Sequence, residues 1–354
     1  MGEKKNNRSC KVGGQAVLEG VMMKNEERYA VAIRKPDGHI EVMTEVYKGT
    51  AGDDKWKKLP FIRGVFNFVD SLILGMKCIT YSASFYEEEE GKETKAEKAA
   101  DHVLKGKAEE VVMGFTILLS LLIAIGLFMV LPYVMTLWLD NFIRNASLLL
   151  LLEGLLRILI FILYILAISG MKDIHRLYQY HGAEHKCINC MERGRVLTVE
   201  NVMKSSRQHK RCGTSFLLFV MFVSIILFFF IRVDQPVLRL VIRIALIPVI
   251  AGISYEIIRL AGSSDNVLVK IISAPGLWLQ KLTTKEPDEA MVEVAIAAVE
   301  AVFDWKTYFR ETFDYNVDEA SRILEKSKEE EFADEESTDR ESAETEQLNG
   351  EQAE

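Results

Sequence analysis

The sequence predicts a mainly α-helical membrane protein: a four-helix transmembrane bundle with a small N-terminal α/β cap and C-terminal cytoplasmic helices. Two observations lead to this fold class. Hydrophobic residues make up 49% of the chain, and they are concentrated in its middle, in four segments near or above the ~20 residues that a helix needs to cross a bilayer. Near the N-terminus, apolar and polar residues alternate with the period of a β-strand.

The four predicted transmembrane helices occupy residues 111–139, 148–171, 213–231 and 236–260. The first carries no charged residue, and Pro132 is expected to kink its far end. In the second, Glu153 and Arg157 stand four residues apart and are expected to pair on one helix face.

Residues 1–110 are predicted to form a cytoplasmic cap and a charged linker. Alternating apolar residues on both sides of Pro36-Asp37-Gly38 predict one β-hairpin, whereas the glycines of residues 12–23 are interpreted as tight turns. Residues 61–86 predict an amphipathic helix whose three charges recur every seven residues. Such a helix lies on a membrane or packs on the hairpin, and a fifth span is the less favoured alternative.

The distribution of Lys and Arg predicts the orientation of the bundle. Residues 172–213 contain nine of these basic residues, whereas the connection at 140–147 contains one. We therefore expect a multi-pass protein of the cell membrane, with both termini and a motif loop at 172–213 in the cytoplasm. Residues 111–260 would form the membrane domain and 261–324 the C-terminal cytoplasmic helices. Residues 325–354, with thirteen acidic and three basic side chains, predict a disordered acidic tail.

The motif loop contains the residues that point to chemistry. His181, Glu184 and His185 form the pattern His-x-x-Glu-His, in which two histidines one helical turn apart bind a metal ion and a carboxylate works as general base. His209 and Cys212 follow just before the third span. A thiolate together with imidazoles suits zinc or another late transition metal.

Two ligand sets remain open on these residues alone. One consists of His181, His185, His209 and Cys212, with Glu184 beside the ion and a position left for water. The other is a closed structural zinc site made of Cys187, Cys190, His209 and Cys212. Glu256, in the fourth predicted span, is either the ion-pair partner of Arg243 or Arg259 or a group for ligation or proton transfer.

Four dispersed segments closely resemble the YqhQ family of bacterial multi-pass membrane proteins, which are uncharacterised and described as predicted metal-dependent enzymes. The segments are Gly13-Gly14-Gln15-Ala16-Val17-Leu18-Glu19-Gly20-Val21-Met22-Met23, His181-Gly182-Ala183-Glu184-His185-Lys186, Arg211-Cys212-Gly213-Thr214-Ser215-Phe216 and Ala274-Pro275-Gly276-Leu277-Trp278-Leu279-Gln280. The resemblance covers about residues 10–310. It favours the histidine-rich ligand set, because Cys187 does not belong to the family's signature.

These observations predict a metal-dependent, hydrolytic integral membrane enzyme whose site lies at the cytoplasmic membrane face. The predicted ligands are His181, His185, His209 and Cys212 for a divalent metal, with zinc favoured, and the predicted catalytic residue is Glu184. The alternative from another class is a non-catalytic membrane scaffold or assembly factor held by a structural zinc site. The expected partners are the lipid bilayer and an unknown substrate, without nucleic acid.

Overall fold

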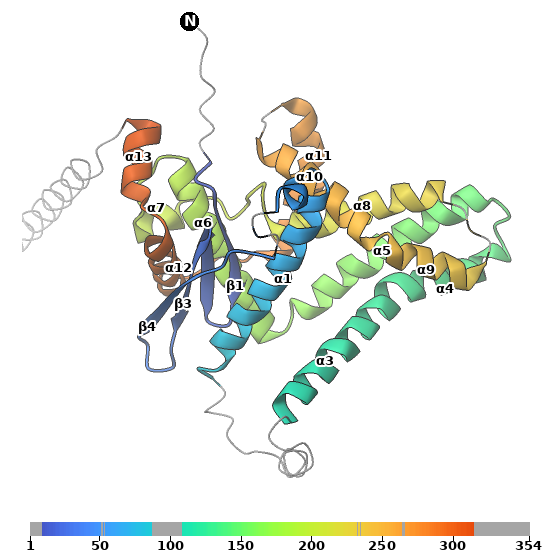
Figure 1. Cartoon of the computed structure of the whole chain (residues 1–354), viewed down its shortest axis with the longest axis horizontal. Helices are drawn as coiled ribbons and strands as arrows, with labels where there is room; N and C mark the ends of the chain where they lie inside the picture. Colours follow the sequence, from blue (N-terminus) through green and yellow to red (C-terminus); the bar gives the residue numbers. More distant parts are fainter. Residues whose placement is uncertain are drawn as a thin grey trace, which may run out of the picture.

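The computed structural model describes residues 9–50, 52, 54–86, 108–231, 233, 235–263 and 266–314. The acidic tail predicted at 325–354 and the charged linker of the predicted N-terminal region, residues 87–107, therefore lie outside the described residues, as does the last part of the predicted C-terminal helical region. A mainly helical chain with an N-terminal sheet is confirmed (Figure 1).

The N-terminal sheet has four antiparallel strands in the order β1-β2-β3-β4. These are β1 (Val12–Val17), β2 (Gly20–Asn25), β3 (Arg28–Arg34) and β4 (Ile40–Val46). The predicted hairpin is β3–β4, but residues 12–25 form a second hairpin where turns were expected. Gly14 pairs with Met23 and needs to be glycine, since a Cβ there would stand 2.6 Å from the Met22 carbonyl oxygen. Glycine has a low propensity for β-strands, so the sequence of β1 does not predict a strand.

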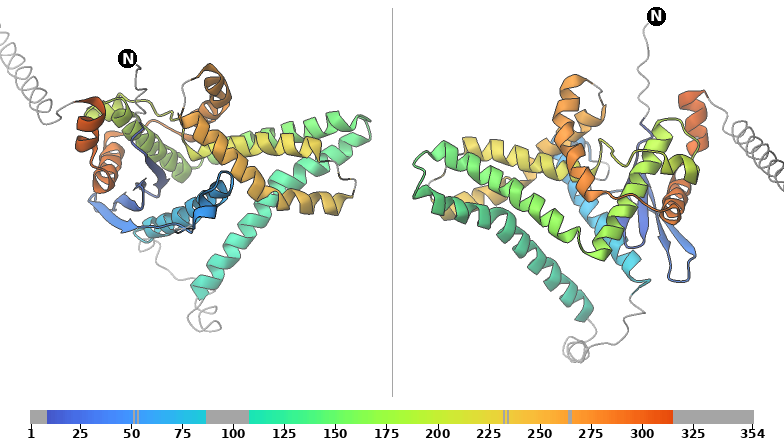
Figure 2. Two further views of the ribbon diagram at one scale, coloured as in Figure 1. Left: turned by 45° about the horizontal axis from the view of Figure 1, so that its top comes forward. Right: turned by 180° about the vertical axis from the view of Figure 1, so that it is seen from behind.

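Helices cover both faces of this sheet (Figure 2). On one face, α6 (Lys172–Glu192) and α12 (Glu289–Val302) pack on the strands. The apolar residues Met291, Val292, Val294, Ala295, Ala298 and Val299 recur at helical spacing, and all are buried in this interface. On the other face lies α1 (Ile62–Ala83), whose Leu74 and Cys78 pack on Val31 and Ile33. The predicted amphipathic helix therefore packs on the sheet, and it is not among the candidate spans.

Three described helices are long and apolar enough to cross a membrane, or four if a bent pair counts as one span. The first joins α3 (Ala108–Ile125), a π-helical turn η3 (Gly126–Val130) and α4 (Leu131–Asp140). The others are α5 (Ala146–Ile168), α8 (Gly213–Phe230) and the pair α9 (Pro236–Ala245) and α10 (Ile247–Ser263), which is bent by 42°. The π-helical turn directly precedes Pro132, because proline cannot donate to the normal helical ladder.

Ion pairs connect these helices to one another. Glu153 accepts from Arg157 at 3.2 Å, as predicted, and also from Arg243 of α9 at 2.5 and 2.9 Å. Glu256 forms an ion pair, but its principal partner is Arg63 of α1, at 2.6 Å, while Arg259 lies 3.9 Å away. The ion-pair interpretation of Glu256 thus fits the geometry, with a partner that the sequence did not indicate.

Three further helices complete the described part of the chain. These are α7 (Val199–Met203), α11 (Val267–Thr283) and α13 (Trp305–Phe313). The segment 172–213 is largely helical rather than a loop, because α6 fills half of it. Proline usually ends or kinks a helix, but α11 continues through Pro275. The next residue, Gly276, lets α11 approach α8 closely, since a Cβ there would stand 2.8 Å from Ser215 Oγ.

Candidate metal centre

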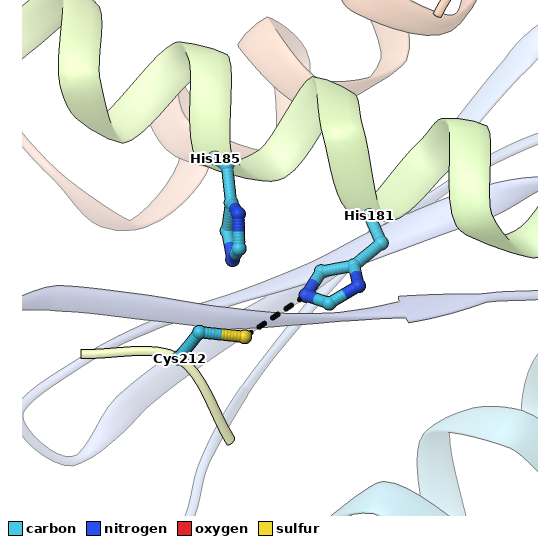
Figure 3. Close-up of side chains that lie close together, drawn as sticks. All are labelled: His181, His185 and Cys212. Carbon is cyan, nitrogen blue, oxygen red and sulfur yellow. Dashed lines mark hydrogen bonds between the residues drawn. The ribbon is translucent and has the colours of Figure 1, made fainter. Parts of the chain in front are cut away.

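His181 and His185 stand one turn apart on α6 and present their rings to the same space (Figure 3). The Nδ1 atom of His181 lies 2.9 Å from the Thr283 carbonyl oxygen, and that of His185 lies 2.6 Å from the Arg207 carbonyl oxygen. A carbonyl oxygen only accepts hydrogen bonds, so each Nδ1 carries the proton. In the neutral rings, both Nε2 atoms then keep the lone pair that a metal ion needs.

Cys212 completes this group from the first turn of α8. Its Sγ lies 3.1 Å from His181 Nε2 and accepts from the Thr214 backbone N–H at 3.4 Å. One ligand atom from each of His181, His185 and Cys212 lies within 4.8 Å of the other two. Two imidazole nitrogens and one sulfur therefore lie close enough together to bind the same metal ion.

The electrostatics of this group favour a thiolate. Burial alone would raise the pKa of Cys212, but the imidazoles of His181 and His185 hold it well below its ordinary value. Burial would likewise lower the pKa of His181, yet the Cys212 thiolate beside it raises that pKa to about 9. The thiolate is the form of cysteine that binds metals.

Glu184 is buried between α6 and β1, next to the group. Its carboxylate accepts from the Gly14 backbone N–H, and burial raises its pKa although His185 and His181 oppose the shift. Among the described residues, Glu184 Oε2 and His185 Nε2 are buried without a hydrogen-bond partner. Buried polar atoms without partners call for a water or an ion. His185 Nε2, together with the His181 nitrogen and the Cys212 sulfur, fits a divalent metal of the zinc type.

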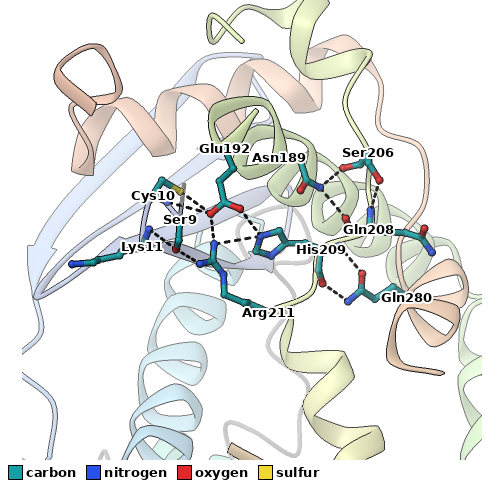
Figure 4. A network of polar contacts seen from close by, with 10 residues as sticks. All are labelled: Ser9, Cys10, Lys11, Asn189, Glu192, Ser206, Gln208, His209, Arg211 and Gln280. Carbon is teal, nitrogen blue, oxygen red and sulfur yellow. Dashed lines mark hydrogen bonds and ion pairs between the residues drawn. The ribbon is translucent and has the colours of Figure 1, made fainter. Parts of the chain in front are cut away.

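His209 lies outside the group of three, although it was predicted as a ligand. Its ring centroid is 5.9 Å from that of His185, but its Nε2 faces Glu192 Oε2 at 3.4 Å. Glu192 also accepts from Arg211 and from the Cys10 backbone N–H (Figure 4). Burial lowers the pKa of His209, and the carboxylate of Glu192 partly offsets this. The ring is thus held by a polar network beside the candidate ligands.

The closed cysteine-rich set is not assembled in the described part of the chain. Cys187 is fully buried in the core beneath the sheet, and Cys190 Sγ faces the carbonyl oxygens of Arg195 and Val196. Neither of these cysteines belongs to a group of described side chains that could share an ion. Cys212, which both sets contain, turns toward His181 instead.

Gln280 on α11 is a further site residue that the sequence reasoning did not single out. Its side chain is fully buried and accepts from the His209 backbone N–H at 2.8 Å. It donates to the His209 carbonyl oxygen at 2.6 Å and to Ser215 Oγ at 2.9 Å. Gln280 thereby holds both sides of the turn that carries Cys212. Its place in the segment 274–280 was the only sequence signal.

Residues 59–305 match the family described as "Protein of unknown function (DUF1385)". The chain belongs to this family. As a DUF1385 member it is 37% identical over 290 residues to "Uncharacterized protein YqhQ" of Bacillus subtilis (strain 168), an alignment that covers 80% of this chain and 89% of that protein. This confirms the resemblance drawn from the four motifs. No solved structure matches the chain. All three candidate ligands and Glu184 fall within the DUF1385 match.

Proposed function

We propose that this DUF1385 protein is a metal-dependent, hydrolytic membrane enzyme, with its ion held by His181, His185 and Cys212. The observation that carries the proposal is the convergence of these three ligand atoms, of which His185 Nε2 is buried without a hydrogen-bond partner, near the buried and likewise unpartnered Oε2 of Glu184. Three protein ligands leave a fourth tetrahedral position open, as in catalytic zinc sites, whereas structural sites use four protein ligands.

The residues of the chain take distinct roles in this proposal. The Thr283 and Arg207 carbonyl oxygens fix the tautomer and orientation of the two imidazoles, and the Cys212 thiolate offsets the positive charge of the ion. A bound divalent ion would lower the pKa of water and polarise a carbonyl or phosphoryl group. We assign to Glu184 the role of taking the proton from that water, because it is buried beside His181 and His185 and its raised pKa would suit a general base.

The position of the site supports action at the membrane surface. Cys212 is the N-cap of α8, a candidate span. The excess of Lys and Arg between residues 172 and 213 assigns this end of the span to the cytoplasm. We therefore propose a cytoplasmic membrane face as the place of reaction, in a four-span arrangement in which α9 and α10 together cross once.

A scaffold function is the second candidate, because the site is buried and joins α6 to α8 and α11. X-ray absorption at the zinc edge of the zinc-loaded protein separates the two. We expect one sulfur, two imidazoles and a light ligand that exchanges with added anions. A shell filled by four protein ligands would favour the scaffold. A hydrolase screen with the wild type and Glu184→Gln then tests the base, since the variant should keep its zinc and lose activity.

A further inference from the structure

We propose that α1 is an interfacial membrane helix, whose outward face rests among the headgroups and upper acyl chains of the bilayer that the candidate spans cross. This face consists of five exposed apolar residues at helical spacing: Val69, Leu72, Ile73, Met76 and Ile79. Leu72 is 56% exposed within the described structure. A contiguous apolar stripe of this kind marks a contact surface rather than a surface that faces water.

The three charged side chains of α1 all contact polar groups of the protein. Arg63 binds Glu256 of α10 at 2.6 and 2.7 Å, Asp70 accepts from the Tyr47 hydroxyl at 2.9 Å, and Lys77 pairs with a carboxylate of β4. A surface helix in water places its charges outward and its apolar face inward. The helix α1 is apolar toward the sheet, and its outward face is apolar apart from Thr80 and the exposed part of Lys77, which fits a boundary between protein and lipid.

The helix is joined directly to two candidate spans (Figures 1 and 2). Gly64 approaches α10 so closely that a Cβ would stand 3.0 Å from Gly252 Cα. Phe68 stacks on Phe216 in the first turn of α8, with ring centroids 5.4 Å apart. Because α8 and α10 expose apolar side chains of their own, α1 lies against helices whose outer surfaces lipid would also cover.

The 3₁₀ turn before α1 has the composition of a membrane anchor. It spans Lys55–Lys58 and contains three lysines around Trp56, which is 56% exposed. Leu59 and Phe61 follow it and are also exposed. Tryptophan and lysine gather at membrane interfaces, where the indole sits at the headgroup level and the ammonium groups meet lipid phosphates. The occupant of this face is therefore the bilayer.

Site-directed spin labelling of the full chain in lipid nanodiscs tests this inference. Nitroxides at Leu72→Cys, Ile73→Cys and Met76→Cys should collide several-fold more with oxygen, relative to a water-soluble nickel chelate, than a nitroxide at Val46→Cys. Val46 is 60% exposed on β4, on the sheet. The five native cysteines are buried, and the unsubstituted chain gives the labelling background.

Two results would overturn the proposal. Nickel accessibility equal to that at Val46 would show that the face lies in water. Exclusion of both oxygen and nickel would show that a second copy or another protein covers it. Thr80→Cys, an exposed position four residues after Met76 and seven after Ile73 on the same helix face, gives the same readout if the replacement of apolar residues disturbs folding.

Discussion

His181 Nε2 lies 3.1 Å from Sγ of Cys212, a residue that follows 31 positions later. The contact joins α6, which packs on the sheet, to the first turn of a candidate span. The two ligands can meet only if the chain between them is held in place. Asn189 donates to the carbonyl oxygens of Ser206 and Gln208, and Gln280 binds the next residue, His209.

The role of Gln280 leads to a first prediction. Gln280→Leu removes an amide that serves three buried polar groups, so the turn that carries Cys212 should loosen. We expect zinc affinity to fall by about 10- to 100-fold, as for other residues that orient metal ligands, in competition with a chromophoric chelator. Gln179→Leu is the matched control, because Gln179 donates to one carbonyl oxygen at an exposed position. Equal affinities in the two variants would show that Gln280 does not position the ligand.

A pair of neighbouring glycines tests the contact between β1 and Glu184. In Gly14→Ala the new Cβ would stand 2.6 Å from the Met22 carbonyl oxygen and 2.9 Å from Glu184 Cγ. We expect lower thermal stability and weaker zinc binding, because the strand and α6 must move apart. A Cβ on Gly13 meets nothing within 4 Å, so Gly13→Ala should resemble the wild type in both measurements. Loss of stability in both variants alike would point to strand propensity instead.

The buried charges between the candidate spans give a third prediction. In Glu153→Gln, Arg157 and Arg243 keep their charges but lose the carboxylate that both contact. Breaking a buried ion pair costs about 3–5 kcal/mol, and we expect a loss of this order in the free energy of unfolding in detergent micelles. Glu200→Gln breaks an exposed pair with Lys204 and should cost less than about 0.5 kcal/mol. Similar losses in both variants would rule out a special role for the cluster.

The proposed orientation predicts where added cysteines react in intact cells. Asp37→Cys lies in the exposed turn between β3 and β4, and Asn141→Cys lies between α4 and α5. If the sheet is cytoplasmic, an impermeant maleimide added outside should label the second variant and label the first only after lysis. The opposite pattern would reverse the topology.

Elements with a local signal were predictable from the sequence. The apolar runs of α5 and α8, the apolar face of α12 and the pair Glu153–Arg157 depend on neighbours within one or two helical turns. The spacing of His181 and His185 likewise put both rings on one side of a helix, and the structure brings Cys212 to them.

Features that depend on distant partners were not predictable in this way. The strand β1 has glycines where strand formers are expected, and it exists because it pairs with β2 and packs on α6. Arg63 binds Glu256, which stands 193 positions away, and nothing local indicates that pairing. His209 turns toward Glu192 because Arg211 and Glu192 form an ion pair beside it, a contact that residue spacing does not reveal.

Metal stoichiometry measured by mass spectrometry on the purified protein tests whether His181, His185 and Cys212 hold an ion. After zinc supplementation, the wild type should carry stoichiometric metal, His185→Ala should lose most of it because a ligand is gone, and Cys187→Ser should keep it. A wild type without stoichiometric metal, or a Cys187→Ser variant that loses its metal while His185→Ala retains it, would contradict the account.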